Sequence, residues 1–113
     1  MAPAHVDIAP DVPQKFIVAT VIGTDGNETL CLVGNPNAKW HKDIADALPT
    51  IGLTLVEVVG GGRVELSSSE KTIKVWGRSD RYGEVDLTLV RRILEEAFPG
   101  YALLSVGEHE IGP

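Results

Sequence analysis

Residues 58–65 read VVGGGRVE, in which three consecutive glycines separate two apolar runs and one arginine, Arg63, follows directly. Valine-rich runs are typical of β-strands, and glycine accepts the backbone conformations that let a chain reverse direction. We therefore expect one strand over residues 53–59, a turn at the glycines, and another strand over residues 63–67. The glycines also leave space around Arg63, whose guanidinium has the shape to hold two oxygens of a phosphate. The alternative is a surface arginine that merely follows a flexible turn.

The segments before this stretch predict a hairpin and then a helix. Residues 16–22 are almost all apolar and often β-branched, which indicates a central strand covered on both faces. The Asp-Gly pair in TDGN (24–27) predicts a tight turn, and residues 28–33 the returning strand. A helix should follow, with Asn37 as its N-cap and Gly52 after its last turn. Its expected buried stripe consists of Trp40, Ile44, Ala47, Leu48 and Ile51.

The segments after it predict a strand, a second helix and a last strand. Residues 71–77 alternate apolar and polar side chains, as a half-buried strand does. Asp86 stands where an N-cap belongs, and the Pro-Gly pair at 99–100 should end the helix. A strand over residues 101–106 and a solvated tail from residue 107 complete the chain. The buried stripe expected for the second helix is Leu87, Val90, Ile93, Leu94 and Ala97.

The expected order of elements is therefore ββαβββαβ. Such an order predicts an α/β (α+β) fold, in which a mixed β-sheet of about six strands is flanked by two helices. Residues 1–14 contain three prolines and no hydrophobic period, so we expect them to form a loosely packed N-terminal arm. Residues 15–113 should form a single domain.

Composition excludes several classes of protein. The chain has 113 residues, of which 16 are acidic and 10 basic, and its net charge of -6 argues against a surface made for nucleic acid or an anionic membrane. Cys31 is the single cysteine, so the chain forms no internal disulfide and no thiolate metal cluster. Neither a signal-peptide pattern nor an apolar run of about 18 residues is present. We expect a cytoplasmic monomer.

His41 is the first candidate for a catalytic group. It follows Trp40 and therefore lies about 100° around the expected helix from it, at the border of the buried stripe. In the first helical turn the positive end of the helix dipole favours the neutral imidazole, which a general base requires. The alternative from the residues alone is a histidine that covers the edge of the core and has no chemical role.

The loop RSDRYG (78–83) is the second candidate. It joins a strand to a helix, and at such junctions successive backbone N–H groups can converge on an anion, with Ser79 adding a hydroxyl. The alternative is a plain connection. Phosphate-loop and dinucleotide motifs are absent, and His5, His41 and His109 are far apart in sequence, so we expect neither a metal nor a cofactor.

Three stretches in this order, KWHKDI (39–44), GGGRV (60–64) and KTIKVWGRSDRYG (71–83), resemble the Janus/Ocnus family of phosphohistidine phosphatases. The resemblance implies a metal-independent hydrolase that removes phosphate from phosphohistidine, and in some members from phospholysine. Histidine-phosphorylated proteins or peptides are the partners that it implies.

The resemblance also implies residue roles. His41 matches the catalytic histidine and Arg63 the arginine that handles the phosphate, while Lys15 matches a lysine at the pocket edge. The segment that holds the phosphoryl oxygens corresponds to Ser79, Asp80 and Arg81.

Two departures from the family pattern concern charge. Another arginine of the family, which precedes the histidine, falls here near Val33 or Gly34. Asp80 and Arg81 stand where relatives tend to have an apolar and a small residue. Asp80 would repel a phosphate if it pointed inward, whereas Arg81 could replace the lost positive charge.

Three questions of function stay open at this stage. His41 either activates a water molecule or attacks phosphorus itself, and we favour the water because no second histidine is placed to receive the phosphoryl group. A non-catalytic module that binds phospho-ligands or proteins is the main alternative to an enzyme. A general phosphomonoesterase is a third possibility, disfavoured because no cysteine loop or metal site is available to expel an alkoxide.

Overall fold

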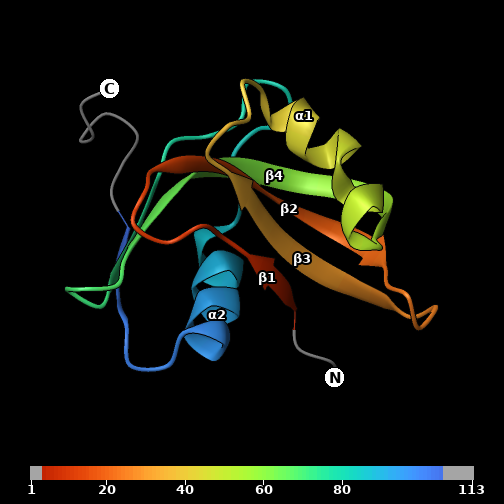
Figure 1. Cartoon of the computed structure of the whole chain (residues 1–113). Coiled ribbons are helices and arrows are strands. Elements are labelled where there is room, and N and C mark those ends of the chain that lie inside the picture. The colour runs from red at the N-terminus through yellow and green to blue at the C-terminus, as the bar shows by residue number, and fades with distance from the viewer. Residues whose placement is uncertain (1–3, 106–113) are drawn as a thin grey trace.

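The computed structural model describes residues 4–105, and the expected tail from residue 107 lies outside them. One six-stranded sheet, in the order β1-β3-β2-β4-β5-β6, is flanked by two α-helices (Figure 1). The predicted mixed sheet of a single α+β domain is therefore confirmed. In chain order the elements are β1 (His5–Asp7), β2 (Gln14–Ile22), β3 (Glu28–Asn35), α1 (His41–Asp46), the short 3₁₀ helix η1 (Leu48–Ile51), β4 (Thr54–Ser67), β5 (Thr72–Trp76), α2 (Leu87–Ala97) and β6 (Ala102–Ser105).

Strand β2 is the centre of the sheet, as its apolar sequence predicts. It pairs antiparallel with β3 on one side and with β4 on the other. Its side chains alternate between two cores: Phe16 and Val18 pack with residues of α2, whereas Ile17 and Ala19 pack with residues of α1. The predicted β2–β3 hairpin and the double coverage of β2 are both confirmed.

The glycines at 60–62 do not form a turn, so the expectation of two separate strands there is wrong. Strand β4 runs unbroken from Thr54 to Ser67, and Gly60, Gly61 and Gly62 lie opposite Val18, Ile17 and Phe16 of β2. Pairing with the central strand keeps the chain extended although glycine itself would permit a reversal. The pairing shifts twice before the glycines, which leaves Val56 and Val59 as extra residues on β4.

The N-terminal segment is more ordered than the expected loose arm. Strand β1 pairs parallel with β3 and forms one edge of the sheet, which gives the order βββαββαβ. The side chain of Gln14 fastens the segment after β1, because Ala9 N donates to its Oε1 over 3.1 Å and its Nε2 donates to Ala9 O over 2.7 Å. A three-residue strand has no periodic signal of its own, which is why sequence reasoning missed it.

Helix α1 is shorter than expected and begins later. Its N-cap is Trp40 rather than Asn37, and the side chain of Asp43 accepts the hydrogen of Trp40 N over 3.0 Å. Of the expected buried stripe only Ile44 and Leu48 are buried, and the stripe fails because η1 replaces the second half of the helix. Trp40 is 58% exposed.

Helix α2 agrees better with its sequence pattern. Asp86 is its N-cap and accepts hydrogen bonds from Thr88 N at 2.8 Å and Leu89 N at 3.4 Å. The stripe residues buried against the sheet are Val90, Ile93 and Leu94; Leu87 and Ala97, at the two ends, are exposed.

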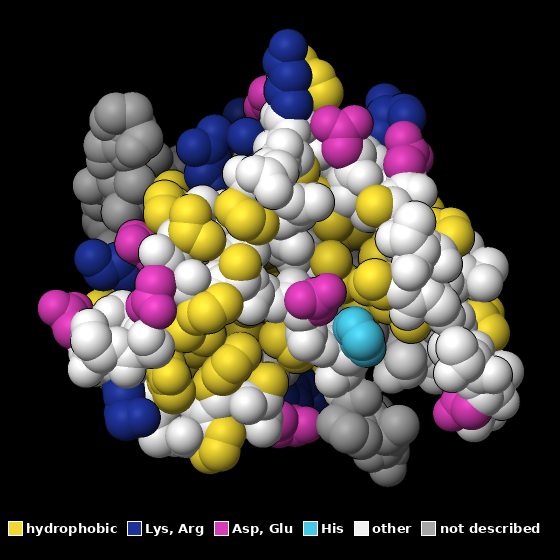
Figure 2. Space-filling model, viewed as in Figure 1, with side chains coloured by type: hydrophobic (Ala, Val, Ile, Leu, Met, Phe, Trp, Pro, Cys, Tyr) yellow, Lys and Arg dark blue, Asp and Glu magenta, His cyan; other side chains and the backbone are white. Residues whose placement is uncertain are grey.

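The two α-helices lie on opposite faces of the sheet (Figure 1). Apolar side chains gather over α2 and the neighbouring sheet, whereas basic side chains, with acidic ones between them, lie at the end of the molecule where α1 begins (Figure 2). Across residues 4–105, no helix has the length and apolar character needed to cross a bilayer.

Candidate functional site

A pocket of about 380 Å³ opens on the α1 face of the sheet. Strands β2 and β4, the start of α1 and the loop after β5 meet there, although they are far apart in sequence. All six predicted site residues contribute to it, and so do six of the chain's ten lysines and arginines. Its lining residues are Lys15, Lys39, Trp40, His41, Lys42, Arg63, Arg78, Ser79, Asp80 and Arg81.

The floor of the pocket carries two positive charges side by side. Lys15 of β2 and Arg63 of β4 are directly opposite each other in the antiparallel pairing. Like charges at opposed positions destabilise a sheet by about 0.2–1 kcal/mol, so the pair is costly unless an anion neutralises it. The pair therefore favours an anion-binding site at this position.

His41 enters the same pocket from the first residue of α1. Its side chain is 7% exposed, and its Nε2 lies 2.9 Å from the carbonyl oxygen of Gly62 on β4. A carbonyl oxygen can only accept a hydrogen bond, so Nε2 carries the hydrogen and the neutral ring has its lone pair on Nδ1. This tautomer leaves Nδ1 as the nitrogen able to accept a proton.

The surroundings of His41 favour its neutral form. Burial lowers the pKa of His41 below its ordinary value of 6.5, and the nearby charges of Lys15 and Arg63 lower it further. The hydrogen bond to Gly62 and the negative charge of Asp80 act in the opposite direction but are outweighed. The imidazole is therefore an unprotonated base near neutral pH, as the sequence predicts, with burial rather than the helix dipole as the main cause.

Gly61 makes room for the imidazole. A Cβ atom at Gly61 would lie 2.9 Å from His41 Cδ2, 3.2 Å from Ser79 Cβ and 2.8 Å from the carbonyl oxygen of Phe16. Because Cδ2 faces β4, Nδ1 on the other edge of the ring faces away from that strand. The expectation that the glycines remove crowding from the pocket is correct, although the turn that accompanied it is not.

The loop after β5 closes on itself around Ser79, whose side chain is 1% exposed. Its Oγ accepts hydrogen bonds from Arg81 N at 3.2 Å and Tyr82 N at 3.0 Å, and Gly83 N donates to Ser79 O over 2.8 Å. The amides of Arg81, Tyr82 and Gly83, which we expected to converge on an anion, thus have acceptors within the loop. The hydroxyl hydrogen of Ser79 remains as a donor, so its predicted contact with the phosphoryl group stays a prediction.

Asp80 and Arg81 are exposed on this loop at the pocket. The carboxylate of Asp80 is close enough to raise the pKa of His41, so it partly offsets the positive field. The guanidinium of Arg81 lies over the ring of Tyr82, with 5.7 Å between Cζ and the ring centroid. Its charge also acts to lower the pKa of Lys42 on α1, although Asp46 raises that pKa by more. Arg81 therefore lies near the start of α1 in the lining of the pocket.

Four lining residues were given no role from the sequence, namely Lys39, Trp40, Lys42 and Arg78, although Arg78 belongs to the candidate loop RSDRYG. The signal was present in KWHK (39–42), where two lysines and a tryptophan surround the candidate histidine. The expectation that Trp40 belongs to the buried stripe is wrong, and its exposed ring lines the pocket between the two lysines.

The place of the family's additional arginine is filled by the core. Val33 is buried in the apolar cluster under α1. A Cβ atom at Gly34 would lie 2.5 Å from Oε1 of Gln14, so a longer side chain there would displace the residue that fastens the N-terminal segment. An arginine at position 34 is therefore incompatible with this packing.

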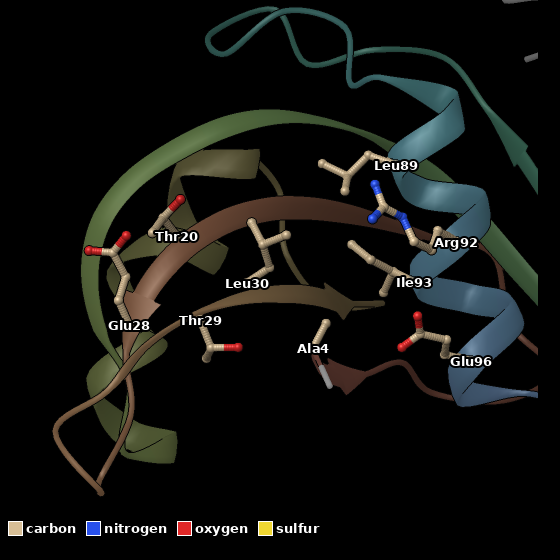
Figure 3. Close-up of a pocket in the computed structure, with 9 residues that line it drawn as sticks. All are labelled: Ala4, Thr20, Glu28, Thr29, Leu30, Leu89, Arg92, Ile93 and Glu96. Carbon is tan, nitrogen blue, oxygen red and sulfur yellow. The ribbon is translucent and has the colours of Figure 1, made fainter. Parts of the chain in front are cut away.

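A second pocket, of about 300 Å³, lies on the other face between α2 and the β2–β3 hairpin (Figure 3). Leu30, Leu89 and Ile93 form its apolar part, and its charged residues are Arg92 and two glutamates, Glu28 and Glu96. Its lining contains no histidine or cysteine. An anionic group is disfavoured there, and the pocket at His41 is the better candidate for chemistry.

Histidine, cysteine and carboxylate side chains do not gather into a metal-binding group of three or more anywhere in residues 4–105. The positive charge in the pocket is supplied by lysine and arginine.

Sequence comparisons relate this chain to one protein family. The model of the Janus/Ocnus family matches residues 2–102. The sex-regulated protein janus-A of Drosophila mauritiana is 31% identical over 102 residues, which cover 87% of this chain and 75% of the fly protein. Janus-A of Drosophila pseudoobscura pseudoobscura is 34% identical over 107 residues, covering 87% and 71% of the two chains. The 14 kDa phosphohistidine phosphatase of Sus scrofa is 30% identical over 108 residues, covering 87% and 85%.

Proposed function

We propose that this chain, which belongs to the Janus/Ocnus family, is a protein phosphohistidine phosphatase that hydrolyses the phosphorus–nitrogen bond without a metal ion. The observation that carries the proposal is the meeting of a neutral, tautomerically fixed His41 with the cation pair Lys15 and Arg63 in one pocket. The similarity to a pig phosphohistidine phosphatase supports the reaction class.

The cations would hold and neutralise the phosphoryl group. A phosphoryl group carries about -1.5 to -2 charges near pH 7, which Lys15 and Arg63 together match. Arg63 can bind two oxygens at once through its planar fork, and Lys15 supplies a point charge. The Ser79 hydroxyl adds a neutral donor. Phosphoryl transfer depends mainly on such positioning and charge stabilisation, because little covalent chemistry is required of the protein.

His41 would then act as the general base. Nδ1 takes a proton from a water molecule as its oxygen bonds to phosphorus, and the phosphorus–nitrogen bond breaks on the opposite side. The electron pair of that bond goes to the leaving nitrogen, which takes a proton from solvent, and His41 then returns its own proton to solvent. The hydrogen bond from Nε2 to Gly62 holds the ring in place and stabilises the imidazolium that forms. Direct attack of Nδ1 on phosphorus is the covalent alternative; it would leave a phosphorylated His41 that a rapid quench traps.

The first test is turnover of a histidine-phosphorylated peptide in the presence of a chelator. His41→Gln removes the base but retains an amide donor near the position of Nε2, so the contact with Gly62 can persist. We expect kcat to fall by about 10²–10⁴-fold. His5→Gln is the matched control, because His5 is exposed on β1 and outside the pocket. Full turnover in His41→Gln, or none in the unchanged protein, would contradict the proposal.

A non-catalytic module that binds phospho-ligands is the second candidate. The observation that favours it is the apolar packing at Val33 and Gly34, where the family's additional arginine is replaced. In that case phosphopeptide binds to the pocket but no phosphate is released. The two candidates are separated by measuring binding and phosphate release in the same sample.

A general phosphomonoesterase is disfavoured by the state of Cys31. The thiol is buried, and burial raises its pKa to about 11, so it remains protonated and unreactive. Faster release of phosphate from phosphoserine than from phosphohistidine would revive this function.

A further inference from the structure

The pocket carries more positive charge than one phosphoryl group requires. Lys15 and Arg63 on the floor already match the charge of the group. Four more basic residues line the walls and mouth. A volume of about 380 Å³ is in the range of sites for whole small molecules and exceeds what a phosphoryl group fills. The space beyond the phosphoryl group is therefore available to another part of the substrate.

One side of the mouth is formed by Lys39 and Trp40, just before α1. Trp40 is 58% exposed although tryptophan is costly to leave in water, and Lys39 Nζ lies 5.7 Å from the centroid of its ring. Packing does not explain this exposed ring, since neither buried cluster includes it. An aromatic ring with a cation beside it is typical of residues that anchor a bound chain.

Arg81 lines another part of the same pocket, on the loop after β5. Arg81 lies over the Tyr82 ring and close enough to α1 to affect Lys42. Lys42 itself is paired with Asp46 across 2.6 Å. Neither Lys39 nor Arg81 forms an ion pair with a carboxylate of residues 4–105. These two cations line the pocket and therefore have their charge available to a ligand.

We infer that the mouth of the pocket selects phosphohistidine segments with acidic neighbours, the carboxylates binding between Lys39 and Arg81 while Trp40 packs against the peptide. This inference rests on the proposed function for the position of the phosphoryl group. It adds a substrate class: acidic phosphohistidine sites are preferred over neutral or basic ones. Charges at such a rim set the rate of encounter and the choice of partner more than the final affinity.

The test compares two histidine-phosphorylated peptides that differ only in having Glu or Gln on both sides of the phosphohistidine. We expect kcat/KM to be about five- to twentyfold higher for the Glu peptide at low salt, with the ratio falling as ionic strength rises. Lys39→Glu should bring the ratio to about one or below. Arg91→Glu makes the same change of charge on exposed α2, across the sheet, and should keep the ratio of the unchanged protein.

Two further measurements separate this inference from the proposed function. Turnover of phosphoramidate, which is too small to reach the mouth, reports the chemistry alone. Dissociation constants for both peptides, measured with His41→Gln, report recognition alone. The inference would be overturned if kcat/KM and affinity were equal for the two peptides. If phosphoramidate were still hydrolysed, the proposed phosphatase activity would stand. Tighter binding of the Glu peptide without any release of phosphate would support the preference for acidic segments and contradict the proposed phosphatase activity.

Discussion

His41 Nε2 donates to the carbonyl oxygen of Gly62 over 2.9 Å, which joins the first residue of α1 to the middle of β4. The bond fixes the tautomer, because only a protonated Nε2 can donate to a carbonyl. It also brings the imidazole beside Arg63, the next residue of β4. One hydrogen bond thus determines both the chemical form of the histidine and its distance from the cations.

Gly61→Ala should damage the pocket and the fold together. The added methyl group would meet backbone at Phe16 and the imidazole of His41 within 3 Å, so one of them must move. We expect a loss of about 1–3 kcal/mol in the free energy of unfolding and a clear fall in kcat. Urea titration and turnover per folded molecule are the measurements. Gly23→Ala, whose methyl group would meet only the Asp25 side chain and Asn27 O, is the control and should keep full activity. Equal turnover in both variants would show that Gly61 does not seat the imidazole.

The stability of the protein should fall as pH decreases through the range just below 6.5. His41 has a lowered pKa in the folded state, so the unfolded chain takes up its proton first and is favoured. The stabilising contribution of His41 is complete above pH 6.5 and is lost as the pH falls towards the pKa of His41 in the folded protein. Urea titrations at a series of pH values should show this slope, and His41→Gln should lack it. Asp11 and Asp25, with pKa values below 3.8, act only at more acidic pH. A slope that persists in His41→Gln would assign it to another group.

Arg63→Gln should lower activity and slightly raise stability. The substitution removes a like charge opposite Lys15, which relieves about 0.2–1 kcal/mol. Turnover should drop by about 10²–10³-fold, as for the loss of one transition-state donor. Lys74→Gln is the contrasting control, because Lys74 lies opposite Glu65 and its loss should lower stability with activity unchanged. A stability loss in Arg63→Gln would indicate that the cation pair is not strained.

Ser79→Ala should loosen the loop after β5. It removes the acceptor of the Arg81 and Tyr82 amides, at a cost of about 1 kcal/mol. Hydrogen exchange of these two amides should accelerate, while exchange of the β2 amides should not. A uniform loss of stability would instead accelerate exchange at both places. Ser67→Ala, at the end of β4, loses the 3.3 Å bond from Glu70 N and the 3.5 Å contact with Ser69 Oγ, and should leave the loop after β5 unchanged. Unaltered exchange in Ser79→Ala would mean that other groups hold the loop.

Elements with a strong local pattern could be predicted from the sequence. The β2–β3 hairpin follows from an apolar run and an Asp-Gly turn, and α2 from its N-cap at Asp86 and a regular stripe. Helix α1 was harder to predict, because Trp40 and Ile51 fit the helical period of apolar residues but are exposed in the structure. A period shows which residues share a side, and packing decides whether that side is covered.

Local chemistry along the chain indicated a base at His41, a cation at Arg63 and a donor at Ser79 in three separate segments, and also that glycines clear the space between them. Lys15, in a fourth segment, was implied only by the family resemblance. Only the tertiary structure decided that these segments meet, that β4 passes straight through its glycines, and that the amides around Ser79 are already bonded. The reason is physical: glycine accepts extended and turned backbone alike, so pairing with distant β2 determines its conformation. The lowered pKa of His41 likewise comes from burial against β4, which no neighbour in sequence provides.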